Sequence, residues 1–404
     1  MLEFLNLVGK NTKPQGQNDQ KPAPQQETKP TNVIPTRPRD VKPSPAIQVV
    51  PIKPAPQPTN KIDVIKPRDR GGKNNWQLKS FIPTGPVKIE RGSLLASVAF
   101  VGSASRFNLL VNSLVKTEGK QYVDPDFPPS FESLWGFGKA PAHYSKAEWG
   151  QYKWKRAVEI FKGPFTVYDD PIDPNDIMQG RLGDCYFLSA ICAIAEWQKR
   201  VKKLFLTRKV TPEGIFCVAL CVNGMWEEVI MDDYFPVTDR GNHYTPAFNR
   251  SKKDNLWVML LEKAWAKVHG GYLNINSGLT REALHDLTGA PSMTFFNDEG
   301  TDDERWDMIW NGDRNDFIMA AGTKNLSGQG RDFYEETTGI VGSHAYSMIG
   351  CVEIIQEGSE YRVLKNHEKS QGKKVTRLVN LRNPWGKGEW KGDWCSTDKR
   401  WNPA

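Results

Sequence analysis

Residues 176–191 read DIMQGRLGDCYFLSAI, and this stretch is the most informative part of the chain for both fold and chemistry. A loop with two glycines leads directly into residues 185–197, which are apolar on nearly every face. A helix with that pattern is buried in the core of a globular protein. Asp184 stands just before it and is of a residue type that favours the N-cap. We therefore predict a buried helix that begins at Cys185.

The position of Cys185 gives its thiol a chemical use. A thiol at a helix N-terminus lies at the positive end of the helix dipole, which lowers the pKa of the thiol. Gly180 and Gly183 allow a tight turn, so that a substrate carbonyl can approach the loop. The Cys185 backbone N–H and the Gln179 side-chain amide supply two donors for the oxyanion of acyl transfer. The alternative interpretation is an inert cysteine of a core helix, because free cysteine is among the most buried residue types.

A base and an orienting group follow downstream. His344 lies in GSHAYS at the start of a predicted strand, and Asn383 lies in LRNPWG at the end of another. A thiol nucleophile needs a base, and the base needs a group that fixes its orientation. The order Cys, His, Asn resembles the papain arrangement. The alternatives are a histidine with a structural hydrogen bond and an asparagine of a simple turn. Cys192, two helical turns after Cys185, is predicted to be a core residue.

The rest of the globular region mixes helices and strands. Residues 256–269 form a second largely apolar helix, which a glycine pair ends. Residues 215–230 are predicted to form a hairpin that turns at Asn223 and Gly224. Short β-branched runs dominate residues 316–382. We predict an α+β fold in which a helix-rich lobe precedes a strand-rich lobe.

The N-terminal region has a different composition. Its first 90 residues hold 15 Lys and Arg against 7 Asp and Glu, whereas the net charge of all 404 residues is +7. The globular part is therefore close to neutral, without the basic stripe that a nucleic-acid-binding fold carries, so no nucleic acid is expected as a partner. Residues 13–70 contain 13 prolines and few aromatic residues. We predict a disordered tail whose positive charge offers contacts to acidic partners.

The cysteines and the apolar runs indicate the cellular compartment. Six scattered cysteines are too few for a disulfide scaffold. The N-terminus shows no signal-peptide pattern, and no apolar run reaches the roughly 20 residues that a membrane span requires. The sequence predicts a cytoplasmic protein without a transmembrane segment, and it makes no prediction of the oligomeric state.

Three segments resemble the signature blocks of the calpain family of cysteine proteases: DIMQGRLGDCYFLSAI, HAYSMIG and LRNPWGKGEWKGDW. The resemblance covers roughly residues 120–402 and implies a papain-like, two-lobed protease core. Its first lobe would hold Gln179 and Cys185, and its second lobe would hold His344 and Asn383. The domain boundaries that we predict are 1–75 for the tail, 76–118 for a linker or N-terminal extension, 119–289 for lobe 1 and 290–404 for lobe 2, which is truncated at its C-terminus.

The resemblance also implies a function. It points to a cysteine endopeptidase that makes limited cuts in intracellular protein substrates through a thioester acyl-enzyme. The chemistry requires no cofactor. The alternative, from a different class, is a catalytically silent interaction module of the same family, which the truncated second lobe keeps open.

Calcium is the regulator that the resemblance implies. Family acid ligands match Asp176 in the first lobe and Glu389 in the second, so these two are the predicted calcium ligands. A further first-lobe glutamate of the family falls at Asn255, and a second-lobe aspartate falls at Ser396, which predicts weakened binding. Another departure is Ser343, which stands before the histidine where many relatives have glycine.

Overall fold

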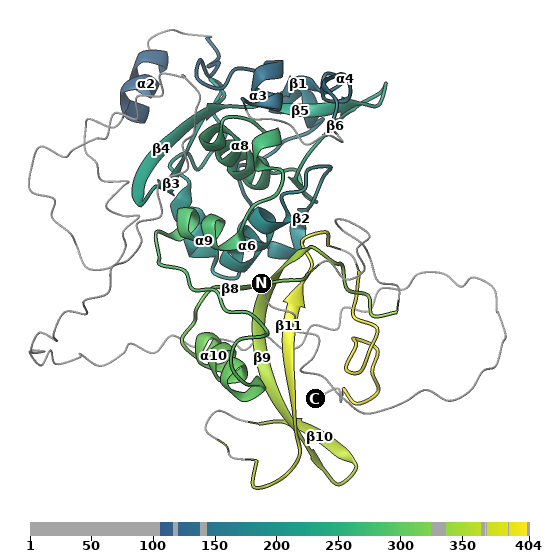
Figure 1. Ribbon diagram of the computed structural model, residues 1–404. Helices are drawn as coiled ribbons and strands as arrows, with labels where there is room; N and C mark the ends of the chain where they lie inside the picture. Colours follow the sequence, from purple (N-terminus) through teal and green to yellow (C-terminus); the bar gives the residue numbers. More distant parts are fainter. Residues whose placement is uncertain are drawn as a thin grey trace, which may run out of the picture. The chain divides into compact units, whose positions relative to one another are not determined.

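The computed structural model of the chain describes residues 106–115, 120–137, 144–324, 337–364, 368, 370–386 and 388–401. The predicted disordered tail and residues 76–105 of the segment after it lie outside the described residues. Within residues 76–118, the structure forms a helix, α2 (Arg106–Val115). Figure 1 follows the chain from this helix to the C-terminal segment.

Two buried helices form the centre of the main core. They are α6 (Cys185–Ala195) and α8 (Trp257–His269). Phe187 of α6 stacks on Trp265 of α8, with ring centroids 4.9 Å apart. Both predicted helices are confirmed, although α6 ends two residues before the predicted end. α8 ends as the glycine pair predicts, because Gly270 adopts a left-handed conformation (φ 81°) and donates to the Ala266 carbonyl.

Short strands surround these helices and add more β structure than the prediction of a helix-rich first lobe indicates. The predicted hairpin is confirmed: Asn223 and Gly224 both have positive φ, 53° and 80°, as a two-residue hairpin turn requires. The pairings are β3 (Ile215–Val222) with β4 (Met225–Asp232), β1 (Lys153–Arg156) with β5 (Tyr234–Asp239), β5 with β6 (Tyr244–Pro246), and β2 (Ile177–Met178) with β7 (Arg250–Ser251).

Short helical segments complete this part of the chain. They are α3 (Phe131–Trp135), α4 (Lys146–Trp149), α5 (Ala157–Ile160), η2 (Pro174–Asp176), α7 (Gln198–Leu204), η3 (Leu273–Ile275) and α9 (Thr280–Thr288).

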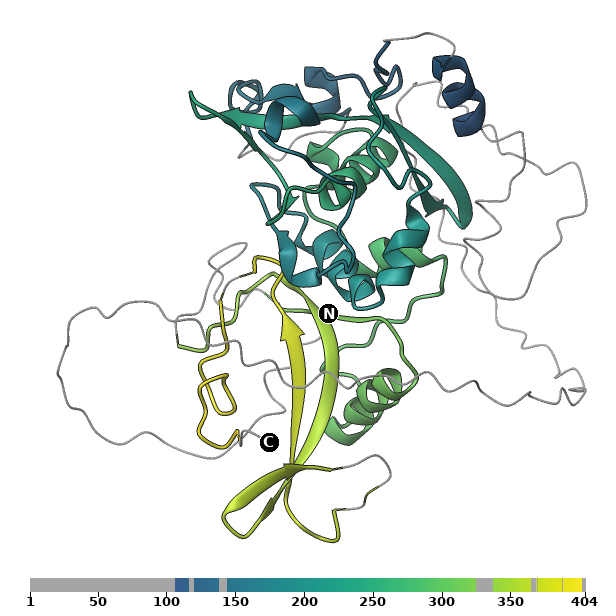
Figure 2. The ribbon, with the colours of Figure 1, turned by 180° about the vertical axis from the view of Figure 1, so that it is seen from behind.

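The long strand β9 (Ala345–Glu357) organises the second part of the chain. It pairs antiparallel with β8 (Met319–Gly322), β10 (Glu360–Val363) and β11 (Val375–Arg382). Figure 1 shows β9 and β11 side by side, and Figure 2 shows them from behind with α10 (Asp302–Arg314) next to β9. Side chains of α10 and β9 share a small core. The mixture of helices and antiparallel sheets confirms the α+β class.

Strand β9 also packs on helix α6. The Ser347 hydroxyl donates to the Ser189 carbonyl at 2.7 Å, and both residues are fully buried. Ala345, at the start of β9, belongs to the main hydrophobic core together with most of α6. Arg382, at the end of β11, forms an ion pair with Glu196 just after α6. The start of β9 therefore lies against the helix that Cys185 begins.

No helix in the described part of the chain has both the length and the apolarity that a bilayer span demands.

Candidate active site

Cys185 is the first residue of α6 and is half-buried. Asp184 occupies the N-cap position, as predicted, but its side chain forms no capping hydrogen bond. The Asp184 carboxyl instead accepts a hydrogen bond from the Asn249 side chain at 2.6 Å. A carboxylate bonded to the N–H groups of the first turn would partly cancel the positive end of the helix dipole. Because the Asp184 carboxyl is not bonded to these N–H groups, the positive potential of the helix N-terminus acts on the Cys185 thiol.

His344 and Asn383 are in direct contact. The Nε2 atom of His344 lies 2.9 Å from the Asn383 Oδ1 atom. The same oxygen accepts the backbone N–H of Trp385 at 3.0 Å, which identifies that side-chain atom as an acceptor. Nε2 must then carry the hydrogen, so Nδ1 is the basic nitrogen of the neutral ring.

The sheet explains why two residues so far apart in sequence meet. His344 immediately precedes β9, and Asn383 immediately follows β11. The two strands are antiparallel, and Arg382 of β11 is paired with Ser347 of β9. The start of one strand therefore lies beside the end of the other. The sequence prediction of each residue at a strand end is correct.

Aromatic rings and one threonine enclose His344, which is 2% exposed. The Trp385 ring centroid lies 4.7 Å from that of the imidazole, and the Tyr346 ring meets the imidazole edge-on at 5.0 Å. The Thr323 hydroxyl accepts the His344 backbone N–H at 3.0 Å. These contacts hold the ring in one orientation. No sequence pattern singled out Thr323.

The loop before Cys185 is held by two buried asparagines that the sequence analysis missed. Asn249 Oδ1 accepts the Gly180 N–H at 3.0 Å, and Asn276 Oδ1 accepts the Gly183 N–H at 2.8 Å. The Gln179 side chain donates to the Leu182 carbonyl at 2.8 Å. Its amide has a second hydrogen, which the proposed oxyanion role requires.

The two loop glycines are explained by contacts within the protein. A Cβ atom at Gly180 would lie 2.1 Å from the Phe248 carbonyl oxygen, and one at Gly183 would lie 2.8 Å from Asn276 Oδ1. Gly180 therefore excludes any larger residue, and a side chain at Gly183 would displace the Asn276 amide. That glycine at these positions also admits a substrate carbonyl stays a prediction from the sequence.

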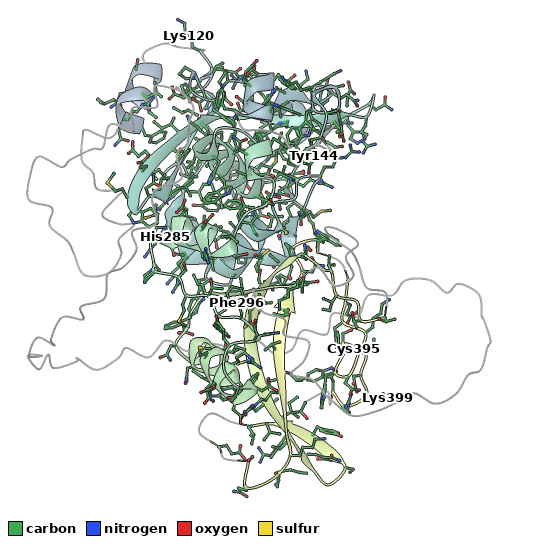
Figure 3. The ribbon with its side chains drawn as sticks, in the orientation of Figure 1. Lys120, Tyr144, His285, Phe296, Cys395 and Lys399 are labelled. Atoms are coloured by element: carbon green, nitrogen blue, oxygen red, sulfur yellow. The ribbon has the colours of Figure 1, made fainter. Side chains whose placement is uncertain are left out.

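The other thiols differ from Cys185 in burial or in position. Burial raises the pKa of Cys192 to about 12 and that of Cys217 well above its usual value. Cys221 and Cys351 are buried as well. Cys395 is half-buried and lies on the C-terminal segment that follows β11 (Figure 3). Among the six thiols, Cys185 alone is both partly accessible and at a helix N-terminus.

Asp176, one predicted calcium ligand, already has a cationic partner. The Lys253 ammonium lies 2.6 Å from its carboxylate and 3.8 Å from that of Asp169. The hydrogen bond to Asp176 raises the pKa of Lys253. Asn255 is buried, and its side-chain oxygen has no hydrogen-bond partner among the described residues.

Glu389, the other predicted ligand, lies at an open cavity of about 520 Å³ together with Trp390, Lys391 and Thr397. Its carboxylate accepts the Ser396 backbone N–H at 3.2 Å. Calcium takes 6–8 oxygen ligands, several of them carboxylates. Among the described residues no three His, Cys, Asp or Glu side chains converge on a common point. These donors do not fit a calcium ion as they stand, and calcium binding at Asp176 and Glu389 stays a prediction.

Comparisons with known proteins agree with the motifs. The family model described as calpain family cysteine protease matches residues 122–404. The chain is 33% identical to calpain-type cysteine protease DEK1 of Arabidopsis thaliana over 307 residues, which is 72% of this chain and 13% of that protein. It is 34% identical to calpain-14 of Homo sapiens over 288 residues, 70% of this chain and 37% of that protein.

A third relative is the calpain-1 catalytic subunit of Mus musculus, 30% identical over 288 residues, again 70% of this chain and 37% of that protein. The chain thus spans much less than half the length of each of these relatives. The match nevertheless includes every segment that carries Gln179, Cys185, His344 and Asn383. The chain belongs to the calpain family of cysteine proteases.

Proposed function

We propose that the chain is a cysteine endopeptidase that cleaves peptide bonds through a thioester acyl-enzyme. The observation that carries the proposal is the hydrogen bond between His344 and Asn383. It forms at the start of strand β9, which packs on the helix that Cys185 begins. That arrangement supplies a nucleophile, a base and an orienting group from three separated segments.

The chemistry follows from the hydrogen positions. The Cys185 thiol gives its proton to His344 Nδ1, and the thiolate attacks the carbonyl carbon of the scissile peptide. The carbonyl oxygen becomes an oxyanion, which the Cys185 backbone N–H and the second amide hydrogen of Gln179 stabilise. The imidazolium then protonates the leaving amine, and the C–N bond breaks. This step leaves a thioester on Cys185.

Hydrolysis of the thioester reverses these roles. His344 removes a proton from water, and the resulting hydroxide attacks the thioester carbon. The C–S bond breaks, the thiolate takes a proton from His344, and the carboxylic acid product is released. Throughout both steps Asn383 keeps Nδ1 directed at the reacting atoms, because it accepts the Nε2 hydrogen.

A thiol-directed epoxide tests the assignment. The purified protein is treated with the epoxide, and the labelled residue is mapped by peptide mass spectrometry. We expect Cys185 to be labelled and Cys185→Ser to lose cleavage of an unstructured protein such as casein. Cys192→Ser is the matched control, because this buried thiol should affect stability and not cleavage. Native protein that binds no epoxide at Cys185 and cleaves nothing would instead support the silent interaction module.

For calcium we propose at most a modest effect, because Lys253 already neutralises Asp176. No step of the reaction is routed through the metal. A cytoplasmic location and intracellular protein substrates stay predictions of the sequence.

A further inference from the structure

A buried polar cluster includes the residue that immediately precedes the proposed nucleophile. It consists of Asp184, Asn249 and Glu262, which are 0%, 1% and 2% exposed. Asp184 precedes Cys185 in the chain, Glu262 lies in the middle of α8, and Asn249 lies between β6 and β7. Polar groups this deeply buried are costly unless each finds a partner.

Asn249 connects the three segments. Its side-chain NH₂ donates to Asp184 Oδ2 at 2.6 Å, and its backbone N–H donates to the Glu262 carboxyl at 3.2 Å. Its side-chain oxygen accepts the Gly180 N–H at 3.0 Å. Asn249 thus contacts Gly180 at the start of the loop of residues 179–184, here called the oxyanion loop, together with Asp184 and the core helix α8.

Burial disfavours the charged form of both carboxyls of the cluster. Burial raises the pKa of Asp184, against the hydrogen bonds from Asn249 and Glu262 that lower it. Burial and the negative charge of Asp184 raise the pKa of Glu262 well above its usual value. A buried pair of this kind retains a proton that isolated carboxyls would lose. Asp184 Oδ1 is buried and has no hydrogen-bond partner among the described residues, so it can accept a hydrogen bond from that proton.

Two buried phenols interact electrostatically with the pair. Tyr186 on α6 and Tyr272 after α8 both have a raised pKa, mainly through burial, with the charges of the pair contributing. Lys263, the neighbour of Glu262 in sequence, is bound to Asp232 and to the Tyr234 carbonyl. It is therefore engaged elsewhere.

We propose that Asn249 and Glu262 are positioning residues, which hold the oxyanion loop and the start of α6 in place through a proton shared with Asp184. The proposal rests on the proposed function, since it takes Cys185 as the nucleophile. It also explains why Asp184 leaves the helix N-terminus uncapped: the Asn249 side chain binds its carboxyl instead.

The pH dependence of stability gives the first test. The folded protein binds the shared proton more tightly than the unfolded chain does, so stability falls as pH rises above the ordinary carboxyl range near pH ~4. Glu262→Gln removes this titration, because the amide donates to Asp184 and accepts from Asn249 without a proton to lose. Between about pH 6 and about pH 9 we expect the melting temperature of the variant to fall less than that of the wild type.

Kinetics give the second test. Glu262→Gln should keep the wild-type kcat, whereas Glu262→Leu and Asn249→Ala should lower kcat on the order of 10- to 100-fold with little change in KM, since a small misplacement of reacting groups has that effect. Asn274→Ala is the matched control. This asparagine donates to the His269 carbonyl at the far end of α8, so its loss should affect stability alone.

Two results would overturn the proposal: a Glu262→Gln variant as slow as Glu262→Leu, or one whose melting temperature follows pH as the wild type does. If Glu262→Leu does not fold, the comparison of Glu262→Gln with the wild type decides alone. The melting curves do not require activity, so they remain decisive even if Cys185 proves not to be the nucleophile.

Discussion

Ser343 adopts a backbone conformation that side chains disfavour, with a φ of 54°. It precedes His344 and donates its backbone N–H to the Lys324 carbonyl at 3.0 Å. The left-handed region costs a residue with a Cβ about 1–2 kcal/mol. This cost gives a physical reason for the glycine that many family members have at the position.

Ser343→Gly should therefore raise the free energy of unfolding by up to ~1 kcal/mol, since glycine relieves the strain but loses more chain entropy on folding. Ser343→Val should lower it, because a branched side chain tolerates this region worst. Urea denaturation of the three proteins measures both changes. A less stable glycine variant would show that the serine hydroxyl makes a contact worth more than the strain.

Gln179 is the residue whose proposed role is easiest to separate from folding. Within the described part of the chain its side chain makes one hydrogen bond, to the Leu182 carbonyl, so Gln179→Ala should leave the melting temperature nearly unchanged. Turnover should fall on the order of 10²–10³-fold, as expected for the loss of one oxyanion donor. Initial rates on a fluorogenic peptide measure the effect. Equal rates for variant and wild type would remove Gln179 from the mechanism.

At the scale of elements, the pairing of η2 with the segment after β7 bears on calcium. Lys253 binds Asp176, and Lys252 donates its backbone N–H to the Asp176 carbonyl at 2.7 Å. A metal at Asp176 would have to displace the Lys253 ammonium. The melting temperature of the wild type should therefore change little with calcium at millimolar concentration.

Lys253→Met should melt at a lower temperature, because Asp176 loses its counter-ion, and calcium should restore part of the loss. Titration calorimetry on the same two proteins measures binding directly. Tight calcium binding by the wild type, coupled to a steep rise in activity, would contradict this interpretation of Lys253.

Local signals explain which elements the sequence predicts well. Asn223 and Gly224 specify their own turn, and Gly270 specifies the end of α8, because each needs only its own backbone angles. The positions of His344 and Asn383 at strand ends are also predicted correctly, because the apolar and β-branched runs beside them are local in the sequence. Asn249 and Glu262 carry no such signal, since their partners come from three distant segments. Buried polar clusters of that kind appear only once the chain is folded.

At the scale of the whole molecule, the sequence divides the chain into a tail, an extension and two lobes. The boundaries at 75, 118 and 289 stay predictions. Deletion of residues 1–75 should leave the melting temperature and peptide cleavage unchanged, because their composition offers no core. Differential scanning fluorimetry and the peptide assay measure both. A clear loss of thermal stability would show that this segment packs on the rest of the protein.

Four of the six cysteines are buried and two are half-buried. The number of thiols that react quickly therefore measures whether the protein is folded. Under native conditions each chain should react quickly with two equivalents of a chromogenic disulfide reagent, at Cys185 and Cys395. In denaturant it should react with six. After Cys395→Ser the fast equivalent should come from Cys185 alone. The stoichiometry of a simple colour reaction would then count competent active sites in any preparation, before a physiological substrate is known.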